Sequence, residues 1–206
     1  MHIRSIACRL LKRGSPVSRA FEYGWILDKI RVGNNVLDVG CVRGKTVQKL
    51  TVALVERGDF VTGVSLMPCL FEHKNFKFVQ DNVLSLDFKS GSFDSVVASH
   101  VLQHIGMPYQ GYTDELDLAG DTKFIEKVYE WMNHNGSLFV LVPFAEKFQY
   151  VSFSSNCRYR IYDSKTLNAL FKNRFEIVDD VTFDGAHDSK KLVKDAKAML
   201  MELKKI

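Results

Sequence analysis

The segment most informative about the fold is Val36-Leu37-Asp38-Val39-Gly40-Cys41-Val42-Arg43-Gly44-Lys45-Thr46. It begins with a short apolar run around one aspartate, which is typical of a buried strand. A glycine follows this run directly, and apolar residues then recur at helical spacing from Lys45 to Arg57. A buried strand, a glycine turn and a helix in this order predict the first unit of an α/β fold.

Strand-like segments recur along the rest of the chain. The segment Ala196–Ile206 favours a helix by propensity, but its apolar part could also close a sheet as a strand. Apolar runs bounded by turn residues predict further strands at Phe60–Val64, Phe76–Gln80, Ser95–Ala98, Ser137–Val142 and Phe175–Val181.

Amphipathic helices separate these strands. Phe124, Val128 and Trp131 share one helical face, and this helix is expected to end near Asn135-Gly136. Because strands alternate with helices, they pair in parallel through right-handed crossovers. The sequence therefore predicts an α/β three-layer sandwich, with a Rossmann-like, mostly parallel sheet of six or seven strands and helices on both faces.

Size and composition indicate one globular domain. The chain has 206 residues, of which 46% are hydrophobic and 25% charged, with a net charge of +4, so a largely disordered protein is excluded. No segment rich in Pro, Gly or Ser divides it. We expect a single domain over residues 1–206, with a helical N-terminal extension at 1–30 and a Rossmann-like core at 31–206.

The patterns of charged, apolar and cysteine residues argue against a nucleic-acid-binding face, a membrane span and a zinc or disulfide framework. The mild basic excess gathers at both ends of the chain and is not interleaved with aromatic residues, so no nucleic-acid-binding face is predicted. No apolar run approaches the roughly 20 residues that span a bilayer. The four cysteines lie far apart, without the spacing of a zinc or disulfide framework. We expect a cytoplasmic protein, and the oligomeric state is left open.

The glycine turn admits three interpretations. A P-loop would use Gly44-Lys45-Thr46, but that motif has four residues between its glycines and this chain has only three. A dinucleotide-binding fingerprint lacks its second glycine, because Val42 stands in that neighbourhood. The third interpretation is Asp-x-Gly-x-x-x-Gly, in which Gly40 permits close approach of a ligand and Asp38 can meet an ammonium group directly or through water.

The third interpretation resembles class I S-adenosylmethionine-dependent methyltransferases. Val36–Cys41 matches their first motif residue for residue, and Phe60–Val64, Phe78–Val83 and Ser92–Ile105 resemble their second, third and fourth strands. The resemblance extends to about Val181. It implies S-adenosyl-L-methionine as the cofactor, with cofactor-binding residues Asp38, Gly40, Cys41, Gly44, Ser65, Asp81, Asn82, Val83, Ser99 and His100.

One departure from the family concerns Ser65. Members of this family usually carry an acidic residue there, at the end of the second strand, to bind both ribose hydroxyls. A serine hydroxyl lacks the charge-assisted pair of hydrogen bonds. The alternative function is therefore a non-catalytic, methyltransferase-like scaffold or partner protein with a weakened cofactor site.

Histidines and a long loop indicate where the acceptor would bind. His100 and His104 have the spacing of a metal pair, but no third ligand is suggested nearby, so no metal is predicted. His104 is a candidate general base or, alternatively, a packed core histidine. The loop Gly106–Asp121 suits substrate selection, although Asp121 could simply cap the next helix.

Candidate substrate-binding residues are Tyr109, Tyr112 and Arg160. The sequence after the fourth strand lacks the Asn/Asp-Pro-Pro-Tyr/Phe pattern expected of enzymes that methylate amino groups of DNA or glutamine. We therefore expect methyl transfer to a small-molecule acceptor, with sugar-linked and lipid-linked molecules included in that class.

Overall fold

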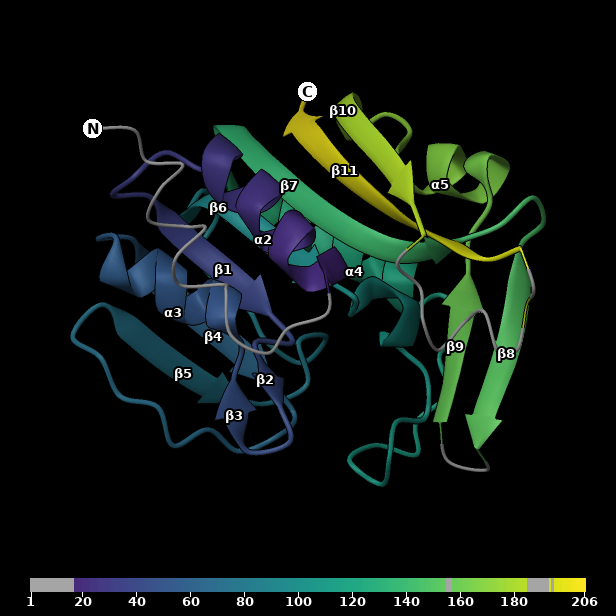
Figure 1. Cartoon of the computed structure of the whole chain (residues 1–206), viewed down its shortest axis with the longest axis horizontal. Helices are drawn as coiled ribbons and strands as arrows, with labels where there is room; N and C mark the ends of the chain where they lie inside the picture. The colour runs from purple at the N-terminus through teal and green to yellow at the C-terminus, as the bar shows by residue number, and fades with distance from the viewer. Residues whose placement is uncertain (1–16, 155–156, 185–192, 194) are drawn as a thin grey trace.

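The fold is built on one central sheet. The computed structural model describes residues 17–154, 157–184, 193 and 195–206. Seven strands lie in the order β10-β11-β7-β6-β1-β4-β5 (Figure 1). They are β1 (Asn35–Val39), β4 (Phe60–Ser65), β5 (Phe76–Gln80), β6 (Phe93–Ser99), β7 (Met132–Phe144), β10 (Phe175–Phe183) and β11 (Lys197–Lys205).

The sheet is mostly parallel. β1 pairs in parallel with β4 and β6, β4 pairs in parallel with β5, and β6 with β7. β11 runs antiparallel to both of its neighbours, β7 and β10. The open question about Ala196–Ile206 is thus resolved in favour of a strand. Met201 and Leu203 pack on one face of the sheet, whereas Ala198 and Leu200 pack on the other, and this two-sided burial overrides helix propensity.

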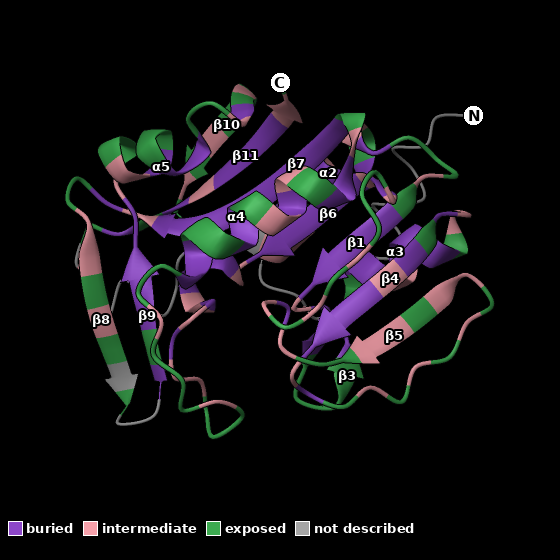
Figure 2. Ribbon diagram, turned by 180° about the vertical axis from the view of Figure 1, so that it is seen from behind, coloured by how far each residue is buried: buried purple, intermediate pink, exposed green. Residues whose placement is uncertain are grey.

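Helices cover both faces of the sheet (Figures 1 and 2). α2 (Val17–Lys29) and α3 (Lys49–Glu56) pack on the face that contains Val36 and Val61. α4 (Gly120–Trp131) and α5 (Ser164–Phe171) pack on the opposite face. The predicted three-layer, Rossmann-like fold is confirmed.

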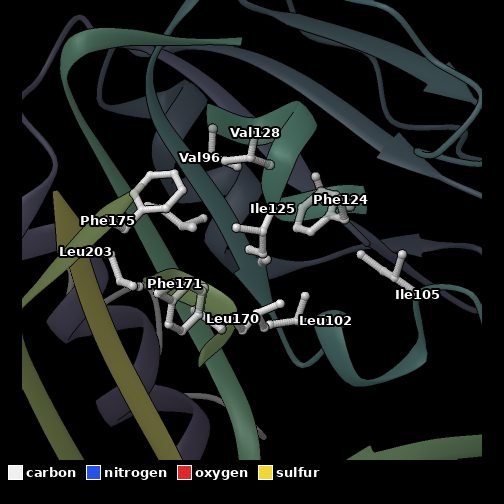
Figure 3. Packing of buried hydrophobic residues seen from close by; sticks show 14 of the residues in the cluster. Val96, Leu102, Ile105, Phe124, Ile125, Val128, Leu170, Phe171, Phe175 and Leu203 are labelled. Atoms are coloured by element: carbon white, nitrogen blue, oxygen red, sulfur yellow. The ribbon is translucent and has the colours of Figure 1, made fainter. Parts of the chain in front are cut away.

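The larger core lies between the sheet and α4 (Figure 3). Phe124, Ile125 and Val128 of α4 are fully buried beside Val96 of β6. Phe171 of α5 extends this cluster toward β10. The regular i, i+4 spacing on α4 therefore marks its buried face, as expected from the sequence.

Helix α4 ends earlier than predicted. It stops at Trp131, and β7 begins at the next residue, so 133–136 belong to a strand. Met132 pairs with Phe93, and the Asn133 side-chain amide donates to the carboxylate of Asp94. These contacts with β6 extend β7 back to the helix and replace the expected loop.

Helix α3 begins later than predicted. Residues Val42–Arg43 (β2) and Thr46–Val47 (β3) pair as a short antiparallel hairpin, and the helix starts only at Lys49. The turn uses Gly44 at φ +67°, a left-handed conformation that favours glycine. The predicted helix from Lys45 therefore began too early, because three of these four strand residues are β-branched and favour extended backbone.

A second hairpin projects beyond the sheet (Figure 1). It consists of β8 (Gln149–Ser154) and β9 (Cys157–Ile161), which follow β7. The 3-10 helix η1 (Leu102–His104) and the loop after it lie beside β9. The hairpin and the loop therefore form a wall at the carboxyl end of β6 and β7.

Part of the N-terminal extension lies within the described residues. Tyr23, Ile26, Leu27 and Ile30 are buried in the cluster that α2 shares with α3. Residues 1–16 of the predicted extension lie outside the described part, and the single-domain assignment over 1–206 stays a prediction. No helix among the described residues is long and apolar enough to cross a membrane.

We expect Phe124→Ala to lower the free energy of unfolding by about 3–5 kcal/mol, because it empties a fully buried site between α4 and the sheet. The matched control is Phe60→Ala on β4, where the phenylalanine is 55% exposed and its truncation should cost less than about 1 kcal/mol. Urea denaturation of both variants measures the difference. Equal losses would contradict the assigned core.

Candidate functional site

A cavity of about 1290 Å³ opens at the carboxyl ends of the parallel strands. It lies where β1 is flanked by β4 on one side and β6 on the other, the position at which open α/β sheets bind ligands. All the predicted cofactor-binding residues except Asp38 and Cys41 line it, namely Gly40, Gly44, Ser65, Asp81, Asn82, Val83, Ser99 and His100.

The Gly40 turn forms one part of the wall. Gly40 adopts φ +74°, and its N–H donates to the carbonyl oxygen of Val64 at 2.8 Å. A Cβ atom on Gly40 would lie 2.8 Å from Cγ2 of Val101. The turn is therefore packed directly against the segment that follows β6, with no room for a side chain.

Gln48 holds this turn in place and was not predicted from the sequence. Its Nε2 donates to the carbonyl oxygen of Gly40 at 2.6 Å, and its Oε1 accepts from the Tyr23 hydroxyl at 2.6 Å. Gln48 also lines the cavity. Because one bond reaches α2 and the other reaches the turn, Gln48 connects the N-terminal helix to the site.

Asp38 and Cys41 are buried away from the cavity wall. Asp38 is 4% exposed, and its Oδ2 accepts from the Thr51 hydroxyl at 2.6 Å. Burial raises the pKa of Asp38 to about 7, against which the Thr51 hydrogen bond acts. Burial also raises the pKa of the Cys41 thiol. The Asp38 carboxylate faces α3, and its predicted contact with a ligand, direct or through water, stays a prediction.

The ends of β4 and β5 contribute polar groups to the cavity. The Ser65 hydroxyl accepts from the N–H of Met67 at 3.1 Å, and the Asp81 N–H donates to the carbonyl oxygen of Ser65. The Asp81 carboxylate accepts from the Asn82 N–H and from the Ser85 hydroxyl. The side chains of Ser65 and Asp81 are thus held by hydrogen bonds to residues close to them in the sequence.

Two buried polar atoms on the wall have no protein partner within the described residues. They are the hydroxyl of Ser99 and Oε1 of Gln103. Leaving a buried polar atom unsatisfied costs about 1–3 kcal/mol. A bound ligand that hydrogen-bonds these atoms would remove this cost.

The N-terminal helix brings a charged pair to the site. Glu22 is fully buried, forms an ion pair with Arg19 at 3.2 Å, and lies 3.3 Å from Nε2 of His100. Arg19 and His100 line the cavity. This pair was not predicted from the sequence, since nothing in the spacing links Glu22 to a residue 78 positions later.

His104 lies on the wall among aromatic rings. Its ring centroid is 4.8 Å from that of Tyr109, and Nδ1 is 3.3 Å from the carbonyl oxygen of Arg158. Because a carbonyl only accepts, Nδ1 carries the proton and Nε2 the lone pair. Burial lowers the pKa of His104 to about 4, so the ring is neutral near pH 7 but weakly basic. Its role as a general base stays a prediction, as do the substrate contacts of Tyr109 and Tyr112, which line the cavity.

Arg160 does not line the cavity, contrary to its predicted substrate-binding role. The side chain is 1% exposed and lies 3.2 Å from the carboxylate of Asp121. Its guanidinium donates to the carbonyl oxygens of Ile105 at 2.7 Å and Leu118 at 3.0 Å. Arg160 is fully engaged in holding the loop between η1 and α4. Asp121 is likewise a partner of this arginine, and the N-cap of α4 is Ala119.

The described residues contain no group of three or more His, Cys, Asp or Glu side chains arranged to hold a metal ion. His100 and His104 instead have separate partners, Glu22 and the backbone of Arg158. The two histidines therefore occupy separate places on the cavity wall.

Comparisons with known proteins agree with this geometry. A family model described as a methyltransferase domain matches residues 7–178. Ribosomal RNA large subunit methyltransferase E of Brachyspira hyodysenteriae is 28% identical over 116 residues, which cover 55% of this chain and 58% of that protein. The chain thus aligns with less than two thirds of this curated relative.

Two solved structures illustrate the shared fold. The Burkholderia thailandensis 1,6-didemethyltoxoflavin-N1-methyltransferase, with 1,6-didemethyltoxoflavin and S-adenosylhomocysteine bound, has a TM-score of 0.68 at 17% identity, covering 90% of this chain and 75% of that chain. A cyclase, SpnF, has a TM-score of 0.68 at 16% identity, covering 94% of this chain and 83% of that chain. At these identities the likeness shows the fold alone.

We expect Arg160→Met to lower the free energy of unfolding by about 3 kcal/mol, because it leaves the buried Asp121 charge and several loop carbonyls without their partner. The matched control is Arg158→Met, two residues away on β9, where the arginine is exposed. Urea denaturation compares the two variants. A loss at Arg160 no greater than at Arg158 would contradict the buried ion pair.

Asp38 should make stability depend on pH. Its pKa is raised from 3.8 to about 7, so the folded chain keeps a proton that the unfolded chain has lost. This stabilisation is complete below the pKa of Asp38 in the unfolded chain, 3.8, and is lost as the pH rises through its folded value of about 7. Asp38→Asn cannot ionise and should gain stability relative to wild type between about pH 4 and 7, as measured by urea denaturation. The exposed control Asp87→Asn should follow wild type; parallel curves for all three proteins would refute the assignment.

Proposed function

Because the chain belongs to the methyltransferase domain family, whose class I members use S-adenosylmethionine, we propose that it transfers a methyl group from S-adenosylmethionine to a small-molecule acceptor. The observation that carries the proposal is the convergence of four strand ends on one cavity. Val39, Ser65, Asp81 and Ser99 lie at or directly after the ends of β1, β4, β5 and β6, and all four line it.

The residues present fit the cofactor. The Gly40 turn leaves backbone open to the cavity, Ser65 offers a hydroxyl for the ribose, and Asp81 offers a carboxylate for the adenine amino group. The Ser99 hydroxyl and the Gln103 amide oxygen have no hydrogen-bond partner within the described residues, so each can bond a polar group of a ligand. Asp38 does not line the cavity, and its carboxylate accepts a hydrogen bond from Thr51 of α3 two residues before the turn.

The chemistry divides between cofactor and protein. S-adenosylmethionine supplies an activated methyl group. The chain's own task is to bind and orient the two reactants and to exclude water. Tyr109, Met107 and Ile105 contribute an apolar, aromatic section of the wall beside the strand ends. A proton must leave the acceptor when the methyl group goes to the oxygen of a hydroxyl or the nitrogen of an ammonium group.

Cavity size supports a small acceptor. Pockets for single small ligands usually measure about 300–1,000 Å³. At about 1290 Å³, this cavity has room for a second small molecule beside the cofactor. The Brachyspira relative is named for ribosomal RNA, so short RNA oligonucleotides belong in the acceptor assay beside phenols, heteroaromatic bases and carboxylic acids, with release of S-adenosylhomocysteine as the readout. Methylation of RNA alone would overturn the acceptor class.

Ser65 favours the second candidate, a non-catalytic scaffold with a weakened cofactor site. The hydroxyl already accepts a hydrogen bond from the Met67 N–H, and it carries no charge for the ribose. Calorimetric titration of Ser65→Asp with S-adenosylhomocysteine separates the candidates. An active enzyme binds without the substitution, whereas a weakened site binds measurably only with it.

We expect the wild-type chain to bind S-adenosylhomocysteine and Gly40→Ala to bind it at least about tenfold more weakly, because the new Cβ would collide with Val101 and displace the turn. Isothermal titration calorimetry measures both affinities. Gly33→Ala is the matched control, since Gly33 also has a positive φ but lies outside the cavity with open space around it. If the wild-type chain does not bind S-adenosylhomocysteine at millimolar concentration, the proposed methyltransferase activity is refuted.

A further inference from the structure

A histidine and a buried carboxylate meet at the edge of the cavity. Nε2 of His100 lies 3.3 Å from both Oε1 and Oε2 of Glu22. Glu22 is fully buried on α2, whereas the His100 side chain keeps 20% of its surface accessible and lines the cavity. One ring nitrogen thus faces a carboxylate inside the protein while the ring itself borders the ligand space.

The backbone of His100 is held in an unusual conformation. Its φ is +56°, which non-glycine residues seldom adopt. Its N–H donates to the carbonyl oxygen of Leu141, and its own carbonyl oxygen accepts from Nε2 of Gln103. Strained backbone that is fixed on both sides is typical of functional positions.

The carboxylate selects the tautomer of the neutral ring. Because Glu22 can only accept, Nε2 of His100 carries the hydrogen and Nδ1 keeps the lone pair. No hydrogen bond to this Nδ1 is formed within the described part of the chain. A carboxylate that orients an imidazole and stabilises its protonated form is the arrangement found in hydrolase triads.

His104 lacks this support. Its Nδ1 faces the backbone carbonyl oxygen of Arg158, which stabilises an imidazolium less than a carboxylate does. His104 also packs between the rings of Tyr109 and Tyr159. Between His100 and His104, His100 alone has a carboxylate partner among the described residues.

We propose that His100 is the general base for the acceptor and that Glu22 is its positioning residue, an inference that rests on the proposed methyl transfer. As the acceptor oxygen or nitrogen bonds to the methyl carbon, the carbon–sulfur bond of S-adenosylmethionine breaks and its electron pair stays on sulfur. The acceptor hydrogen passes as a proton to Nδ1 of His100. The electron pair of the broken O–H or N–H bond stays on the acceptor, and the imidazolium is paired with Glu22.

The charges around His100 are consistent with this role. Burial lowers the pKa of the His100 ring, the Glu22 carboxylate opposes that shift, and Arg19 and Arg43 add to it. A positive charge on His100 in turn lowers the pKa of the nearby His104 ring. His100 is therefore neutral near pH 7 and free to accept a proton.

The first test is nuclear magnetic resonance of 15N-histidine-labelled protein, with His100→Gln used to assign the signal. In wild type we expect a neutral His100 ring with hydrogen on Nε2. Glu22→Gln should move its titration midpoint to lower pH, and the conservative Glu22→Asp should restore part of the shift. The exposed His134 serves as the internal control and should not move. A hydrogen on Nδ1, or a midpoint unchanged in Glu22→Gln, overturns the proposal.

The second test separates a base from a cofactor ligand, the role predicted for His100 from the sequence. His100→Gln should bind S-adenosylhomocysteine within about threefold of wild type, whereas loss of a cofactor contact would weaken binding tenfold or more. A tenfold loss overturns the proposal. Failure of wild type to bind at all instead refutes the proposed function, and the resonance experiment still reports on the Glu22–His100 pair.

Discussion

The contact between the Gly40 turn and Val101 is the constraint on which the site depends. β1 lies between β4 and β6, so the chain leaving β1 must pass over the end of β4 and beside the chain leaving β6. The Gly40 N–H bonds the end of β4, while its missing side chain leaves space for Val101 after β6. Sheet pairing already places the ends of these three strands side by side, and the residue without a Cβ lets the segments that leave β1 and β6 pack closely beside the cavity. Gln48 then fixes the carbonyl of this residue from the opposite side.

The sequence predicted what depends on local pattern. Apolar runs at β1, β4, β5, β6 and β7 are buried or half-buried over most of their length, so their positions could be predicted directly. The cofactor side was also predictable, because motifs that end strands must lie at the carboxyl edge of a parallel sheet. Ser65, Asp81 and Ser99 reached the cavity for this reason.

Long-range contacts could not be read in this way. Glu22 and His100 are far apart in the sequence, and a glutamate on an amphipathic helix gives no sign that it will be buried. Arg160 looked like an anion-binding residue, but it satisfies backbone carbonyls that only the folded loop brings together. The β2–β3 hairpin was missed for a different reason, since apolar residues at helical spacing also fit a hairpin followed by a shorter helix.

The buried Arg160 has a consequence for how acceptor choice could change during evolution. It binds the loop between η1 and α4 through main-chain oxygens of Ile105 and Leu118, so the anchor does not depend on which side chains the intervening residues carry. Tyr109 and Tyr112 lie between these anchor points. Substitutions there can reshape the pocket while the loop keeps its attachment. Under the proposed function, a change of acceptor preference would need substitutions in this loop and no change in the sheet beneath it.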